Sequence, residues 1–108
     1  MTFPSPTTDS FALITGASQG IGEAVARQLA AAGYNVLLVA RREAVLMQLA
    51  KELAQAHGIN AEVFAADLSK ERDVTALLDY IGQKKITICV NSAGIASFGP
   101  FMKQDWNY

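Results

Sequence analysis

The chain has 108 residues, of which 51% are hydrophobic, and its formal net charge is −1. This length allows one domain at most, and the apolar content is sufficient for a core. Acidic and basic residues are interspersed, which argues against nucleic-acid partners and a polybasic membrane contact. No apolar run approaches the roughly 20 residues that span a bilayer, and residues 1–10 lack the basic-then-apolar order of a secretory signal. A single cysteine, Cys89, excludes an internal disulfide, so we expect a cytoplasmic protein.

The apolar pattern predicts alternating strands and helices. Residues 1–10 are rich in Pro, Ser and Thr and are expected to form a flexible N-terminus before a domain over residues 11–108. In chain order, we expect a strand at 11–15, a helix at 20–32, a strand at 35–40, a helix at 43–57, a strand at 61–66, a helix between Ser69 and Gly82, and a strand at 86–90. The remainder, 91–108, is expected to be loop, with a further helix starting near Gln104.

Each expected helix carries an apolar face and a stop signal. The faces are formed by Ile21, Val25 and Leu29 in the first helix, Leu46, Leu49 and Leu53 in the second, and Val74, Leu77, Leu78 and Ile81 in the third. Gly33, Gly58 and Gly82 are expected to end the three helices. Ser69 is the expected N-cap of the third helix.

The strands are apolar on both faces, as is typical of parallel sheets covered by helices. Strands that alternate with helices imply right-handed parallel crossovers. The sequence therefore predicts the α/β class: a Rossmann-type doubly wound parallel sheet, truncated to about four strands in the order 3-2-1-4, with flanking helices. In this arrangement the fourth strand is left at the edge of the sheet.

A glycine-rich turn lies between the first strand and the first helix. Its spacing is Gly-x-x-x-Gly-x-Gly, at Gly16, Gly20 and Gly22. Gly16 allows a sharp turn, Gly20 leaves room for a pyrophosphate, and Gly22 allows the helix to pack closely. The N–H groups that open such a helix bind phosphate. A tight turn without a ligand is the alternative, but three glycines cost backbone entropy that a turn alone does not require.

The segment Thr15-Gly16-Ala17-Ser18-Gln19-Gly20-Ile21-Gly22 resembles the cofactor motif of the short-chain dehydrogenase/reductase family, in its compact, NADP(H)-preferring branch. Asp67-Leu68 and Asn91-Ser92-Ala93-Gly94 match two further motifs of that family in the same order. The resemblance implies that the first pair contacts adenine and that the second segment stabilises the sheet and lines the ribose and nicotinamide side. Ser92 departs from the usual Asn. Nucleotide-sugar epimerases of the extended branch usually have a shorter spacing between the first two glycines.

The end of the second strand indicates which dinucleotide is preferred. An acid there would bind the ribose 2′-hydroxyl of NAD, whereas this chain has Arg41-Arg42, which suit a 2′-phosphate. Many NADP-using relatives also have a basic residue at the position of Gln19, which this chain lacks. We expect NADP to be preferred over NAD. The expected cofactor-binding residues are Gly16, Ser18, Gln19, Gly20, Ile21, Gly22, Arg41, Asp67, Leu68, Asn91, Ala93 and Gly94.

No catalytic residue is expected within the chain. The resemblance implies proton relay by Ser, Tyr and Lys, with a Tyr-x-x-x-Lys motif well after the Asn-x-Ala-Gly segment. Tyr80 and Lys84 have this spacing but precede Asn91, and Gly82 should break their helical alignment. No metal site is expected either, because His57 has no second ligand nearby in sequence.

The expected function is that of an NADP(H)-dependent oxidoreductase, with this chain as its N-terminal portion, an incomplete dinucleotide-binding domain that is inactive alone. The full-length form would transfer a hydride between nicotinamide and a small-molecule carbonyl or secondary alcohol, and could form oligomers. Two alternatives stay open: a non-catalytic module that binds NADP(H), and a truncated product without function.

Overall fold

The computed structural model describes residues 4–18, 20–91 and 94–95. It contains one five-stranded sheet in the order β3-β2-β1-β4-β5. The strands are β1 Ser10–Thr15, β2 Asn35–Ala40, β3 Ala61–Ala65, β4 Lys85–Asn91 and β5 Gly94–Ile95. The helices are α1 Gly20–Ala31, α2 Glu43–His57 and α3 Glu71–Ile81. In this part of the chain, no helix combines the length and apolar character needed to cross a bilayer.

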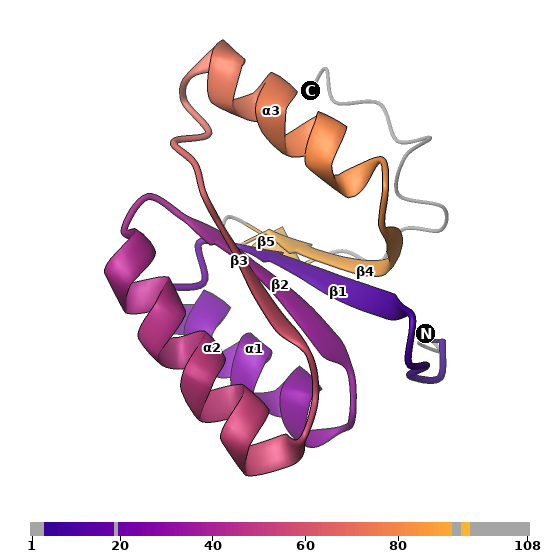
Figure 1. Ribbon diagram of the computed structural model, residues 1–108. Helices are drawn as coiled ribbons and strands as arrows, with labels where there is room; N and C mark the ends of the chain where they lie inside the picture. The colour runs from indigo at the N-terminus through magenta and orange to yellow at the C-terminus, as the bar shows by residue number, and fades with distance from the viewer. Residues whose placement is uncertain (1–3, 19, 92–93, 96–108) are drawn as a thin grey trace.

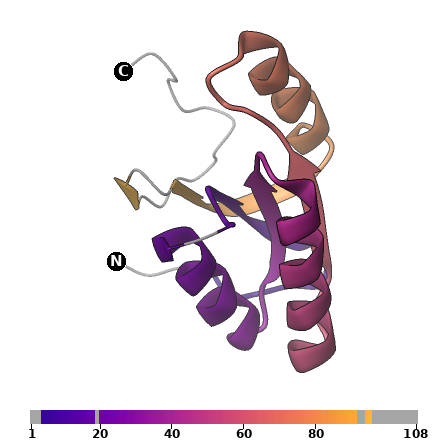
Figure 2. The same cartoon turned by 90° about the vertical axis from the view of Figure 1, so that its left-hand side faces the viewer.

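The first four strands are parallel and are covered on both faces. Helices α1 and α2 lie on one face of the sheet and α3 lies on the other (Figures 1 and 2). Both β2 and β4 pair with β1, and β3 pairs with β2 on its far side. The predicted α/β class and the strand order 3-2-1-4 are therefore confirmed. Because α3 carries the chain from one side of β1 to the other, the strand order changes direction between β1 and β4.

The sequence predicted that the fourth strand would be the edge of the sheet, but in the structure another strand pairs with the end of β4. The two-residue strand β5 pairs antiparallel with it, with Val90 opposite Ile95 and Asn91 opposite Gly94. A pairing of this kind depends on where the chain turns after Asn91, and an apolar pattern does not encode that turn. The expected helix near Gln104 lies outside the described residues.

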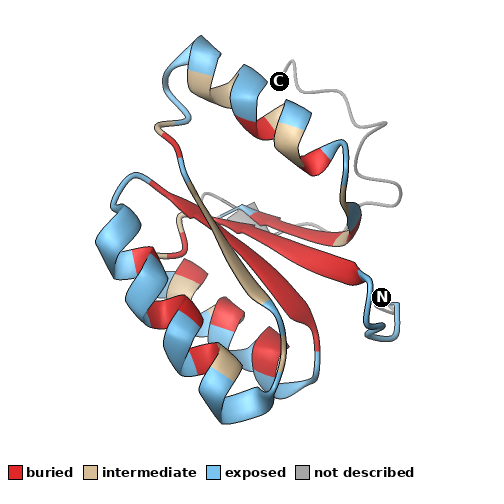
Figure 3. Cartoon of the chain, in the orientation of Figure 1, coloured by how far each residue is buried: buried red, intermediate tan, exposed pale blue. Residues whose placement is uncertain are grey.

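Alternate residues of the central strands enter two separate cores. Ala12, Ile14, Val36 and Leu38 pack on the side of α1 and α2, whereas Phe11, Leu13, Leu37 and Val39 pack on the side of α3. Strands β1 and β2 are buried along their whole length (Figure 3). Burial on both faces explains why these strands read as continuous apolar runs.

Two details of the helices differ from expectation. Ile21 is 61% exposed, because the packed face of α1 is formed by Gly22, Ala26, Leu29 and Ala30 instead. Three of these four residues are small, which lets α1 lie close to the sheet, and Ile21 lies outside this buried face. Ser69 does not cap α3; the N-cap position is Lys70, which makes no side-chain capping hydrogen bond. The hydroxyl of Ser69 donates to Asp67 instead, at 2.6 Å.

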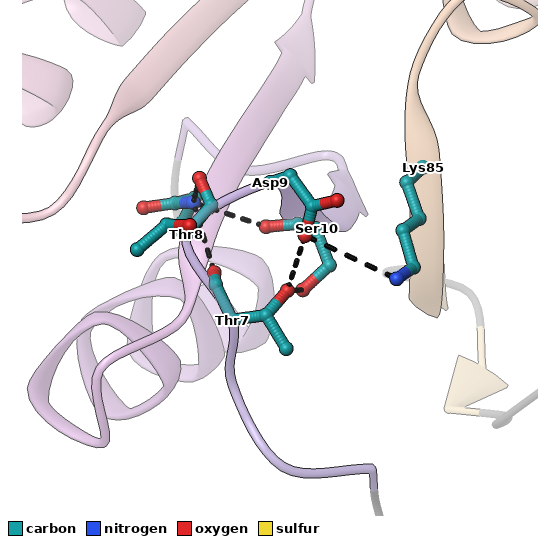
Figure 4. Close-up of polar contacts among 6 residues, drawn as sticks. Thr7, Thr8, Asp9, Ser10 and Lys85 are labelled. Atoms are coloured by element: carbon teal, nitrogen blue, oxygen red, sulfur yellow. Dashed lines mark hydrogen bonds and ion pairs between the residues drawn. The ribbon is translucent and has the colours of Figure 1, made fainter.

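The segment before β1 is attached to the start of β2 by Asn35. This side chain is 5% exposed, and its Nδ2 donates to the carbonyl oxygens of Thr7, Thr8 and Ser10. Its Oδ1 accepts the N–H of Asn60 at 3.0 Å. In Figure 4 the Thr7 hydroxyl reaches both Asp9 and Ser10, and Asp9 forms an ion pair with Lys85 at the start of β4.

A polar cluster joins β3 to the end of α3. Glu62 accepts hydrogen bonds from the Tyr80 hydroxyl and from Lys84 Nζ, the latter at 2.9 Å. Burial raises the pKa of Glu62, but the hydrogen bonds from Lys84 and Tyr80 outweigh it, so the pKa lies below its usual 4.5. The same contacts raise the pKa of Tyr80 and of Lys84. The pKa shifts of Glu62, Tyr80 and Lys84 thus all favour the hydrogen-bonded cluster in which Glu62 is ionised.

Replacing Glu62 by Gln should lower the free energy of unfolding by about 1 kcal/mol near neutral pH, since the half-buried ion pair with Lys84 is lost. A carboxyl whose pKa is lowered on folding contributes its full stability above the unfolded value of 4.5 and loses it as the pH falls through the lower, folded value. The difference between Glu62→Gln and the natural chain should therefore shrink in acid. Urea unfolding at several pH values measures it.

The matched control is Asp79→Asn, which removes an exposed carboxylate of α3 to which no residue in the described ranges donates a hydrogen bond. Its effect on stability should be small across the pH series. A Glu62→Gln deficit that stays constant into acid would contradict the assignment of this stability to the ionised carboxylate.

Candidate functional site

A cavity of about 750 Å³ opens at the carboxyl ends of the four parallel strands. Parallel strands all end at one edge of the sheet, so residues distant in sequence meet there. Its lining consists of Thr15, Gly16, Ser18, Gly20, Val39, Ala40, Arg41, Arg42, Val45, Ala66, Asp67, Leu68, Ser69 and Asn91. The lining comes from the ends of β1 to β4, the turn into α1 and the first turn of α2.

The glycine turn forms one wall of the cavity. Gly16 and Gly20 have φ angles of +67° and +62°, a region that side chains disfavour. A Cβ built on Gly20 would meet no atom within 4 Å, so the space beside it is open. A Cβ on Gly22 would lie 2.2 Å from the carbonyl oxygen of Gly16. The first turn of helix α1 therefore packs directly against the backbone of the glycine-rich turn at Gly16. This contact is possible only with glycine at position 22.

The strand ends are tied to one another by backbone hydrogen bonds. The N–H of Ala17 donates to the carbonyl of Val39 at 3.2 Å, and the N–H of Ala66 donates to the carbonyl of Ala40 at 2.9 Å. The Thr15 hydroxyl reaches the carbonyl of Val90 at 3.5 Å. The turn after β1 is thereby held against β2, and the loop after β3 against the end of β2.

The cavity combines cationic, acidic and apolar groups. The exposed residues Arg41 and Arg42 follow β2, and Asp67 follows β3. The Ser69 hydroxyl and backbone N–H both donate to the Asp67 carboxylate, and with the charges of Lys70 and Arg41 they hold its pKa below the usual 3.8 despite a small opposing effect of burial. Val45 and Leu68 are 40% and 41% exposed and offer apolar surface.

The cavity brings together most of the residues that the sequence predicts for a cofactor site: Gly16, Ser18, Gly20, Arg41, Asp67, Leu68 and Asn91. Ile21 is exposed and is not among the lining residues, Gly22 allows close packing, and Gly94 belongs to β5. Gln19 and Ala93 lie outside the described residues.

The sequence reasoning did not select Thr15, Val39, Ala40, Arg42, Val45, Ala66 and Ser69, which also line the cavity. All of them except Val45 and Ser69 lie within two residues of the end of a strand. This position was the available signal, since the carboxyl edge of a parallel sheet is where ligands bind.

Tyr80 and Lys84 lie away from this cavity. Both are hydrogen-bonded to Glu62, near the amino end of β3, whereas the cavity is at the carboxyl ends of the strands. As expected, α3 ends at Ile81 with Gly82 as its C-cap, so Lys84 lies beyond the helix, yet both side chains reach one carboxylate. Glu62 comes from another element, so the sequence spacing did not reveal it.

The model of the family described as short chain dehydrogenase matches residues 10–107. The chain belongs to the short-chain dehydrogenase family. The predicted family is therefore confirmed. The match extends over all the elements described above, from β1 to β5.

Individual relatives of this short-chain dehydrogenase chain are considerably longer. A very-long-chain 3-oxoacyl-CoA reductase of Eremothecium gossypii is 39% identical over 89 residues, which are 81% of this chain and 25% of that protein. The uncharacterized oxidoreductase YmfI of Bacillus subtilis is 44% identical over 89 residues, which are 82% of this chain and 36% of that protein. The chain thus spans about a quarter to a third of these relatives.

The fold is also similar to that of solved structures. A short-chain dehydrogenase from Sphingobium yanoikuyae in complex with NADPH superposes with a TM-score of 0.74 at 37% identity, over 90% of this chain and 39% of that one. This similarity agrees with the strand order of the sheet.

Substituting Ala for Gly22 should destabilise the chain by about 3 kcal/mol, because the added methyl group would overlap the Gly16 carbonyl, 2.2 Å away. The better helix propensity of Ala, about 1 kcal/mol, is too small to compensate. Gly82→Ala is the control: its backbone is helical and the nearest atom is 3.3 Å from the new Cβ. Denaturant unfolding compares the two, and equal stabilities would refute the close packing at Gly22.

Proposed function

We propose that this chain supplies the dinucleotide-binding domain of an NADP(H)-dependent oxidoreductase that transfers a hydride between nicotinamide and a small-molecule carbonyl or secondary alcohol. The observation that carries the proposal is the cavity at the carboxyl edge of the sheet, with the glycine turn on one side and Arg41 and Arg42 on the other. Membership of an oxidoreductase family and the similarity to a structure in complex with NADPH support it.

The lining residues fit the parts of a dinucleotide. The open space beside Gly20 and the helix start that follows it suit a pyrophosphate, since the first N–H groups of a helix have no intrahelical acceptor. Leu68 and Val45 offer apolar surface for an adenine ring, and the ionised Asp67 can accept a hydrogen bond from its amino group. The bound cofactor would supply the hydride donor or acceptor. This chain's residues bind and orient it.

The preference for NADP over NAD is assigned to Arg41. No carboxylate stands at the end of β2, where it would repel a 2′-phosphate and bind a 2′-hydroxyl. Arg41 lines the cavity and is exposed, so its paired N–H donors are available to a phosphate. One charge-assisted hydrogen bond contributes about 1.5–3 kcal/mol, or about 10- to 150-fold in preference.

A second candidate is a module that binds NADP(H) without turnover, and the Tyr80–Lys84 pair favours it. Lys84 and Tyr80 share the Glu62 carboxylate, which raises the pKa of the Tyr80 hydroxyl and makes it a poorer proton donor. A family-type relay instead needs a phenol whose pKa is lowered by the neighbouring Lys. We therefore propose that this pair is structural and that residues 1–108 alone bind NADP(H) without reducing a carbonyl.

Arg41→Asp should reverse the cofactor preference: NADPH binding should weaken by about 10-fold or more, and NADH binding should strengthen. Titration of reduced-cofactor fluorescence measures both. Lys51→Asp makes the same change of charge at an exposed site on α2 outside the cavity lining and should leave the ratio unchanged. An unchanged ratio in Arg41→Asp would show that this arginine is only a surface charge.

Both candidate functions predict that residues 1–108 alone bind NADPH and do not oxidise it when simple ketones and aldehydes are added. They differ for a longer polypeptide that contains these residues, which only the first candidate expects to oxidise NADPH. Absence of binding at millimolar NADPH would remove both candidates. Substrate-dependent NADPH oxidation by the 108-residue chain would refute the non-catalytic reading and the structural role given to Tyr80 and Lys84.

A further inference from the structure

The loop between β3 and α3 carries Asp67 and Leu68, and its backbone is held by a side chain that does not line the cavity. The N–H of Asp67 donates to Asp73 Oδ2 at 2.8 Å. Asp73 lies in the first turn of α3, and its side chain is 31% exposed. The Asp67 carboxylate itself accepts both hydrogen bonds from Ser69 through Oδ1.

The neighbouring hydrogen bonds show what Asp73 adds. At the start of the loop, the N–H of Ala66 donates to the carbonyl of Ala40 on β2. At its end, the N–H of Lys70 donates to the carbonyl of Asp67, which closes a turn. Between them, the contact from Asp73 fixes the peptide that joins Ala66 to Asp67 to the helix. Without it, this N–H loses its acceptor, while the hydrogen bond to β2 and the turn closed by Lys70 remain.

We propose that Asp73 is a positioning residue for the cavity: it holds Asp67 and Leu68 in the place where they bind the adenine half of the dinucleotide. This inference rests on the proposed function. Asp73 acts through the loop and not by contact, since it is absent from the cavity lining. Its effect should fall on the adenosine half of the ligand and spare the nicotinamide half.

Asp73 also has a purely structural role that must be separated from this one. An acid in the first turn of a helix interacts favourably with the helix dipole. Glu71 occupies the same turn of α3, is exposed, and contacts none of the loop residues within the described chain. Glu71→Ala therefore removes an acid from the same turn and leaves the loop contact intact, which makes it the matched control.

The experiment measures the binding of NADPH, adenosine 2′,5′-bisphosphate and nicotinamide mononucleotide to the full chain. Asp73→Ala should weaken the first two by a similar factor, about 2- to 12-fold, which corresponds to the loss of one ordinary hydrogen bond. Binding of nicotinamide mononucleotide should not change. Asp73→Asn should regain most of the affinity, because its amide oxygen can accept the same N–H. Glu71→Ala should bind all three like the natural chain.

If Asp73→Ala fails to fold, Asp73→Ser serves in its place, since its hydroxyl favours a helix start but ends one atom short of the carboxylate oxygen. Equal affinities of Asp73→Ala (or Asp73→Ser) and the natural chain, or an equal loss in Glu71→Ala, would overturn the positioning role and leave the proposed function standing. If the natural chain binds neither NADPH nor adenosine 2′,5′-bisphosphate, the proposed function fails and this inference fails with it.

Discussion

The contact between the first turn of α1 and the carbonyl of Gly16 is the constraint on which the site depends. A Cβ at position 22 would come within 2.2 Å of that oxygen, so the helix can sit this close to the strand only with glycine there. The close approach brings the start of α1 over the carboxyl ends of the strands. The three glycines of the turn thus have separate roles: two permit positive φ angles and one permits contact.

The charges of the cavity follow from the same edge of the sheet. β2 ends in two arginines, and β3 ends before an aspartate kept ionised by Ser69. Opposite charges on neighbouring strand ends suit a ligand that is anionic at one point and offers hydrogen-bond donors at another. Because parallel strands all end at the same edge of the sheet, residues that are far apart in sequence meet there and form one recognition site.

Much of the fold was predictable because the strands are buried on both faces and several helices end at glycine. For α2, both bounds were predicted as observed, and Gly58 at its end has a left-handed φ of +67°. The errors arose where a side chain takes a partner other than the expected one. Ser69 bonds to Asp67, two residues earlier, instead of capping a helix. Tyr80 and Lys84 meet on Glu62, which is distant in sequence and belongs to β3. Local spacing contains no information about such a distant partner.

The candidate site was predictable where a residue type carries the chemistry, as at the glycines and Arg41. It was missed where ordinary residues such as Val39 and Ala40 matter only by their place at a strand end. The same limit applies to Asp73, whose side chain reaches a backbone N–H six residues earlier and outside its own helix.

Asn35 has a practical consequence for anyone shortening this chain. Its buried side-chain amide donates to the carbonyl oxygens of Thr7, Thr8 and Ser10, so these residues are part of the folded structure at the amino end of β2. A recombinant version starting at Asp9 would retain every strand and helix, yet one amide proton of Asn35 would have lost its acceptors in an almost dry environment. Expression designs should therefore keep the chain from Pro4 onward and place purification tags before it.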